Sequence, residues 1–130
     1  MRGPRLAVQS IGLAGLIGIL ACSPAVLFED RGTGNGASVP FRVTIGALAI
    51  DYAAIDREPS FGCEFGVQLM VQGPDPLAPG RVLASTPVTA VKPGARISGR
   101  LTSPVLGTGE YFLAYLGNKP CDWTVTVSRA

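Results

Sequence analysis

The sequence contains no histidine, and its 130 residues include only three cysteines. Histidine is the usual general base near neutral pH and the usual partner of serine and cysteine nucleophiles, so its absence argues against those classes of enzyme. No two cysteines have the C-x-x-C spacing, and without histidine the chain offers a poor set of zinc ligands. We therefore expect a protein that is not an enzyme and that has no cofactor or metal site.

The chain also lacks a concentrated basic region. Charged residues make up 15% of the sequence, and the formal net charge is +2. Arg2 and Arg5 account for this excess, because the formal charges balance from Cys22 onward. Nucleic-acid-binding proteins usually gather basic residues on one surface, so we expect no nucleic-acid partner.

The N-terminus has the order of features found in a signal peptide. Two arginines are followed by an apolar run, Ile11 to Ala21, and then by Cys22. Eleven residues are too few to span a bilayer as a helix, which needs roughly 20. The residues Ile19-Leu20-Ala21-Cys22 resemble the lipobox of bacterial lipoproteins. That resemblance implies removal of residues 1–21 and attachment of a lipid to Cys22.

Two alternatives to lipidation remain open. Cleavage after Ala25 would release a secreted protein, whereas the apolar stretch that continues to Phe28 would allow an uncleaved membrane anchor. All three place the domain outside the cytoplasm. We expect an exported protein held by lipid at the cell membrane or outer membrane, with its domain in the periplasm or outside the cell.

Residues 22–38 are predicted to form the attachment site and a flexible tether. The stretch from Arg31 to Ser38 is rich in glycine and polar residues and has no apolar period. Its G-x-G-x-G pattern is found in nucleotide-binding loops, but no strand is predicted before it and no amphipathic helix after it. The folded domain is expected to occupy residues 39–130.

From residue 39 onward the dominant pattern has a period of two, which is typical of half-buried strands. The expected strands cover 41–45, 48–52, 63–72, 81–84, 87–91, 96–101, 110–116 and 121–128. A phase shift at Gly46 indicates a bulge or tight bend, and Gly117 to Pro120 are predicted to form a turn. Glu110 to Leu116 is apolar on both faces and is predicted to be a central strand, or one that faces the core on one side and a neighbouring loop on the other. These features predict a small antiparallel β-sandwich of about seven or eight strands.

If Cys22 carries lipid, Cys63 and Cys121 remain as a pair. Oxidising compartments preserve disulfides, so we predict that these two residues are bonded. Each opens a predicted strand on its apolar face, which places the bridge in the core. Trp123 shares the face of Cys121 and is expected to pack near it. Two buried free thiols would be the alternative in a cytoplasmic domain.

The C-terminal segment offers a weak family resemblance. Gly109-Glu110-Tyr111-Phe112-Leu113 and Trp123-Thr124-Val125-Thr126-Val127 resemble the closing hairpin of exported β-domains of the pre-peptidase C-terminal type. The resemblance covers about twenty residues. Its specificity is low, because any stable hairpin favours residues of these types. It supports the fold and implies no activity.

Three sets of polar residues are candidate sites. Arg96 and Arg100, with Lys92 nearby, could bind an anionic polysaccharide or lipid headgroups, although a solvated strand face explains them equally well. Tyr111 and Tyr115 could stack on sugars, but core packing is the favoured interpretation. Asp51, Asp56 and Glu58 could serve a hydrolase or bind calcium, but are expected to be a solvated strand end and loop.

The Pro-rich segment from Gln72 to Gly80 is predicted to be a loop that either recognises a partner or protects a sheet edge. Taken together, these patterns predict a binding or interaction module of the cell envelope with a polysaccharide or protein partner. A small carboxylate-dependent or metal-dependent hydrolase is the first alternative. A structural spacer is the second.

Overall fold

The computed structural model describes residues 25–57, 62–75 and 77–130. This part of the chain consists of antiparallel strands and loops. The strands are β2 (Val26–Thr33), β3 (Gly36–Ala37), β4 (Phe41–Val43), β5 (Leu48–Ile55), β6 (Cys63–Val71), β7 (Arg81–Ser85), β8 (Thr89–Val91), β9 (Arg96–Thr102), β10 (Gly109–Leu116) and β11 (Asp122–Arg129). The predicted signal peptide and Cys22 lie outside the described residues.

No helix that is long and apolar enough to cross a membrane occurs among the described residues.

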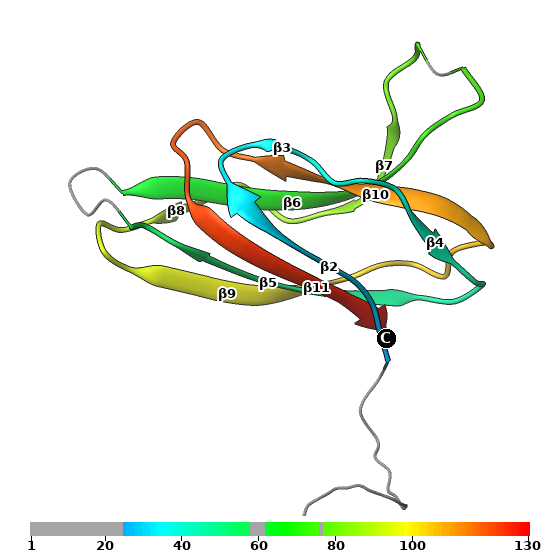
Figure 1. Ribbon diagram of the computed structural model, residues 1–130, viewed down its shortest axis with the longest axis horizontal. Helices are drawn as coiled ribbons and strands as arrows, with labels where there is room; N and C mark the ends of the chain where they lie inside the picture. The colour runs from blue at the N-terminus through cyan, green and yellow to red at the C-terminus, as the bar shows by residue number, and fades with distance from the viewer. Residues whose placement is uncertain (1–24, 58–61, 76) are drawn as a thin grey trace, which may run out of the picture.

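The strands form two stacked sheets (Figure 1). The four-stranded sheet has the order β2-β11-β5-β9. The other sheet has the order β3-β10-β6-β7, with β4 paired to β10 and β8 paired to β6. The predicted all-β antiparallel sandwich is therefore confirmed. Strand β10 is central, as its apolar faces predicted, because it is paired with β6 on one side and with β3 and β4 on the other.

The predicted flexible tether is wrong from Val26 onward, because these residues form β2 and β3. Strand β2 pairs with β11 along almost its whole length, from Val26 opposite Ser128 to Thr33 opposite Asp122. This pairing satisfies backbone groups that a tether would leave to water. The sandwich consequently begins at β2, thirteen residues before the expected domain boundary at residue 39.

The glycines of this segment allow close approach of an aromatic ring. A Cβ atom built on Gly32 would lie only 3.0 Å from Cζ2 of Trp123. Gly34 adopts a φ of +77°, and its carbonyl accepts a 2.8 Å hydrogen bond from Trp123 Nε1. The composition that indicated flexibility therefore serves packing, because only glycine leaves room for the indole here.

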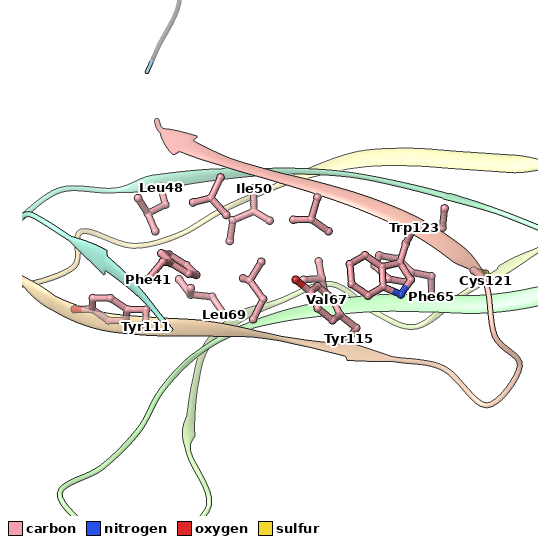
Figure 2. Close-up of a cluster of buried hydrophobic side chains, with 14 of the residues drawn as sticks. Phe41, Leu48, Ile50, Phe65, Val67, Leu69, Tyr111, Tyr115, Cys121 and Trp123 are labelled. Carbon is pink, nitrogen blue, oxygen red and sulfur yellow. The ribbon is translucent and has the colours of Figure 1, made fainter. Parts of the chain in front are cut away.

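The core lies between the sheets and is closed at one end by the disulfide. Cys63 and Cys121 are bonded, as predicted, and both are 2% exposed. Cys63 begins β6 of one sheet and Cys121 directly precedes β11 of the other, so the bridge joins the two layers. Figure 2 shows Trp123 beside Phe65 near this end of the cluster.

Aromatic rings fill the core next to the disulfide. The ring centroids of Tyr115 and Trp123 are 3.8 Å apart, and those of Phe65 and Trp123 are 6.1 Å apart. Such pairs each contribute roughly 0.5–1.5 kcal/mol beyond the burial of their area. The opposite half of the core is filled by aliphatic side chains with Phe41 and Tyr111 (Figure 2).

Candidate functional site

The outer face of the four-stranded sheet carries a shallow depression of about 430 Å³, close to the end where β11 begins. Its floor includes Ala53 and Ile55 of β5 and Thr124 of β11. Ala53 and Thr124 are register partners on neighbouring strands. Alternate residues of a strand share one face, so the side chains of Ala53 and Thr124 point away from the core. Because these side chains are short, they leave a depression at the centre of the outer face.

Three arginines surround this floor. Arg31 is the register partner of Thr124 on β2, and Arg96 is the register partner of Ile55 on β9. Arg57 follows the end of β5 and lines the same depression. Strands β2 and β9 are the two edges of the sheet, so the side chains of Arg31 and Arg96 rise on opposite sides of the floor. We call this feature, formed by Arg31, Arg57 and Arg96 around the floor, the arginine depression.

The charges of the arginine depression are only partly balanced. Arg57 forms an ion pair with Asp122, whose other carboxylate oxygen accepts a 2.6 Å hydrogen bond from the Thr33 hydroxyl. Within the described residues, the guanidinium groups of Arg31 and Arg96 have no ion-pair partner. The three arginines and Asp122 leave a formal charge of +2 on this surface, and both uncompensated groups are exposed.

The three residues predicted to bind anions do not lie together in the structure. Arg96 lines the arginine depression, as described above. Arg100 lies further along β9, where its Nε and Nη2 donate hydrogen bonds of 2.7 and 3.0 Å to the Asp51 carboxylate. These hydrogen bonds, and then the charge of Asp51, raise the pKa of Arg100. Lys92 follows β8 and does not line the depression. Arg100 and Lys92 therefore do not join Arg96 in one site.

The tyrosines considered for sugar stacking belong to the core. Tyr111 is 8% exposed and Tyr115 is 1% exposed. The Tyr111 hydroxyl donates to the Gly107 carbonyl at 2.6 Å, and the Tyr115 hydroxyl donates to Asp30 at 2.7 Å. Burial, followed by the hydrogen bond and the charge of Asp30, raises the pKa of Tyr115 far above its ordinary value. The favoured interpretation, core packing, is confirmed for both residues.

The carboxylates considered for hydrolysis or calcium binding do not form a described cluster. Asp51 is paired with Arg100, while Asp56 is buried and accepts a 3.1 Å hydrogen bond from the Gly94 amide. Asp56 is thus not a solvated residue, in contrast to the expectation. Glu58 lies outside the described residues. In ranges 25–57, 62–75 and 77–130, no group of three acidic or cysteine side chains is placed to hold a metal ion.

A second hollow of about 510 Å³ adjoins the arginine depression at the same end of the sandwich. The two share Thr33, Arg57 and Asp122, and the second adds Lys119 from the turn between β10 and β11. Asp56 also lines this second hollow, so its acidic and basic side chains balance.

Sequence patterns missed Arg31 and Arg57. Arg31 fell within the predicted tether, and Arg57 follows a strand whose end was placed at residue 52. One signal for β2 was present, because the apolar stretch from Ala25 to Phe28 has no use in a tether. The pairing of Arg31 with a residue 93 positions later has no local signal.

No protein-family model matches the chain, and no curated protein matches it. Among solved structures, the chain is similar to a carbohydrate binding module (CBM6cm-2) from Cellvibrio mixtus lichenase 5A in complex with cellotriose. The TM-score is 0.45 and the sequence identity 11%, over 82% of this chain and 99% of that chain. So distant a likeness assigns no ligand to this chain.

Proposed function

We propose that the protein is exported, is anchored by a lipid on Cys22, and acts as a binding module of the cell envelope. The order of charged, apolar and small residues before Cys22 supports export. The disulfide between Cys63 and Cys121 fits an oxidising compartment, where such bonds persist.

Mass spectrometry of the protein from a membrane fraction tests the anchor. We expect a mature chain that begins at Cys22 and carries a diacylglyceryl group. A chain that begins at Val26, the first residue of β2, would indicate ordinary secretion and would contradict lipidation. An intact Met1 would also contradict it.

The ligand that the arginine depression supports best is an acidic polysaccharide. The observation that carries this proposal is the pair of guanidinium groups, on Arg31 and Arg96, that lack ion-pair partners and face each other across a floor of short side chains. A guanidinium binds a carboxylate or phosphate oxygen through charge-assisted hydrogen bonds. Within the arginine depression, Asp122 already pairs with Arg57, so the guanidinium groups of Arg31 and Arg96 are left to meet an external anion.

The dimensions of the depression favour a polymer over an enclosed small molecule. Strands β2 and β9 are three strand spacings apart, or roughly 14 Å. That width accommodates an extended chain lying on the sheet, with acidic groups reaching both edges. The Trp123 indole, which would be the natural stacking surface, is held inward by its hydrogen bond to Gly34. We therefore expect binding to depend on charge and to weaken with salt, because ions screen exposed charges.

Calorimetry with a panel of polysaccharides tests the ligand class. We expect binding to polygalacturonate or alginate and none to dextran, which is neutral. Loss of two charge-assisted contacts in the double variant Arg31→Gln, Arg96→Gln should weaken binding by roughly 1.4–2.8 kcal/mol, which corresponds to about tenfold to hundredfold.

The matched control is the double variant Arg42→Gln, Arg81→Gln. It removes the same charge from exposed positions on β4 and β7 of the other sheet. We expect this control to bind like the wild type. Equal losses in both double variants would show that net charge alone acts, and would contradict a site in the arginine depression. Absence of binding to every polysaccharide would favour a structural spacer.

A further inference from the structure

The end of the sandwich at which β2 begins has exposed aliphatic side chains. Ile45 is 68% exposed and Val105 is 73% exposed, and Val26 at the start of β2 is 53% exposed. The strand expected over residues 41–45 includes Ile45, but β4 ends at Val43. Exposed aliphatic residues that gather at one place on a protein often mark a contact surface.

The backbone fixes the direction in which Ile45 and Val105 point. Gly46 and Leu106 form an antiparallel bridge through two hydrogen bonds of 3.0 and 2.9 Å. Leu106 is buried in the core. Residues on either side of a bridged position point to the opposite face, so Ile45 and Val105 are directed away from the core.

Arg129 connects this turn to the end of β11. Its Nη1 donates a 3.2 Å hydrogen bond to the Ile45 carbonyl, and its Nη2 donates to the Thr44 hydroxyl. The neighbouring residue Ser128 is the register partner of Val26. The turn that carries Ile45 and the start of β2 therefore belong to the same end of the sandwich, as Figure 1 also shows.

The proposed lipid site lies only four residues before Val26. An extended chain covers at most about 3.6 Å per residue, so the Cα atom of Cys22 lies within about 14 Å of that of Val26. A tether of the length first expected, through residue 38, would let the domain move freely above the membrane. The short connection, in contrast, keeps this end of the sandwich at the lipid surface.

We propose that the end formed by Ile45, Val105 and Val26 contacts the lipid bilayer at the level of the headgroups. This inference rests on the proposed lipidation of Cys22. Aliphatic side chains bind at the boundary between the headgroups and the acyl chains of a membrane. They would give the domain a second point of contact besides the diacylglyceryl anchor. The contact fixes the orientation of the domain, because the anchor and the aliphatic side chains then hold it at several points.

This orientation places the arginine depression away from the membrane. Strand β2 starts at the aliphatic end with Val26 and reaches the depression at Arg31 to Thr33. Seven steps of about 3.3 Å correspond to roughly 23 Å between Val26 and Thr33. The depression is thereby presented to polymers outside the membrane surface.

Site-directed fluorescence on the full lipidated protein in vesicles tests the contact. Single variants Ile45→Cys and Val105→Cys accept a maleimide dye, because Cys63 and Cys121 are bonded and lipidation blocks Cys22. Val88→Cys is the matched control, since Val88 is an exposed valine directly before β8, beside Gly66 near the disulfide end. The vesicles contain phosphatidylcholine and phosphatidylglycerol, with or without a lipid that carries a nitroxide quencher near its headgroup.

We expect severalfold stronger quenching of the dye in the Ile45→Cys and Val105→Cys variants than in Val88→Cys. Equal quenching at all three positions, in a sample whose mass confirms the lipid, would overturn the contact and leave lipidation intact. Cross-linking of Ile45→Cys copies without quenching would identify a second copy as the partner and would also overturn it. A second dye on Cys22, with no lipid mass, would overturn both proposals.

Discussion

Removal of the Cys63–Cys121 bridge should destabilise the domain more than any single packing change. The bonded residues are 58 positions apart in the sequence. In the chain-entropy model, closing a loop of that length stabilises the native state by about 4 kcal/mol at 25 °C. Replacing both buried cysteines with alanine also removes packing, at roughly 1 kcal/mol for each position. The double variant Cys63→Ala, Cys121→Ala should therefore lose about 4–6 kcal/mol of unfolding free energy.

Urea unfolding followed by Trp123 fluorescence measures this loss. Trp123 is the single tryptophan and is 7% exposed, so its emission should shift to the red when the core opens. With an m-value of about 1.5–2 kcal/mol/M, the midpoint should fall by roughly 2–4 M. The control variant Cys22→Ala keeps the bridge and should unfold like the wild type. A midpoint change below about 0.5 M in the double variant would refute the assignment of this stabilisation to the bridge.

Two further substitutions, at Tyr115 and Gly117, test individual contacts of the fold. Tyr115→Phe leaves the half-buried Asp30 carboxylate without its hydroxyl donor and should lower the unfolding free energy by about 1–3 kcal/mol in urea at pH 7. Because the native pKa of Tyr115 is raised, the native state retains a proton that the unfolded state loses above about pH 10. Wild-type stability should consequently fall with pH above 10 more steeply than that of Tyr115→Phe, and parallel pH curves for the two proteins would contradict this cause. Gly117→Ala should destabilise the domain by roughly 2 kcal/mol or more in thermal unfolding, because the new Cβ would lie 2.1 Å from the Glu64 carbonyl oxygen at a φ of +153°. Gly36→Ala, where a Cβ meets nothing within 4 Å, is the control, and similar losses in both variants would argue against the steric explanation.

The periodicity of the sequence predicted most of the sandwich. Every strand from β4 to β11 overlaps an expected strand, because alternation of apolar and polar residues is a direct consequence of burying one face. The disulfide followed from the count of cysteines and their phase on the strands. Ile45 was wrongly assigned to a strand, because the alternation of apolar and polar residues continues for two residues beyond the end of β4. These residues belong to a turn before Gly46, where the Ile45 carbonyl accepts a hydrogen bond from Arg129.

The first strand was not predicted, because its inward positions are atypical. Asp30 and Gly32 point toward the core, where periodicity expects apolar side chains. The Asp30 carboxylate accepts a hydrogen bond from the Tyr115 hydroxyl. The Trp123 indole packs against Gly32 and fills the space that a side chain would take. Both partners come from the last strands of the chain, so nothing near residues 26–33 in the sequence specifies them.

The candidate site was predicted in part for a similar reason. Arg96 was selected because it lies on the polar face of a strand that the sequence shows clearly. Arg31 lies on the same surface because its strand, β2, pairs with β11, which lies between β2 and β5 in the sheet. The sequence near Arg31 does not indicate this pairing. Arg100 was selected on the same grounds as Arg96, but Asp51 on the adjacent strand neutralises it, and cross-strand partners depend on register.

Backbone NMR of the isotope-labelled protein during titration with an acidic oligosaccharide tests the proposed binding surface most directly. The account predicts that amide shifts concentrate at Arg31, Ala53, Arg96 and Thr124 on the outer face of the four-stranded sheet. Dextran oligomers, as the neutral control, should leave these amides unchanged. Shifts that concentrate on the outer face of the β3-β10-β6-β7 sheet, or that persist unchanged in the Arg31→Gln, Arg96→Gln variant, would contradict it.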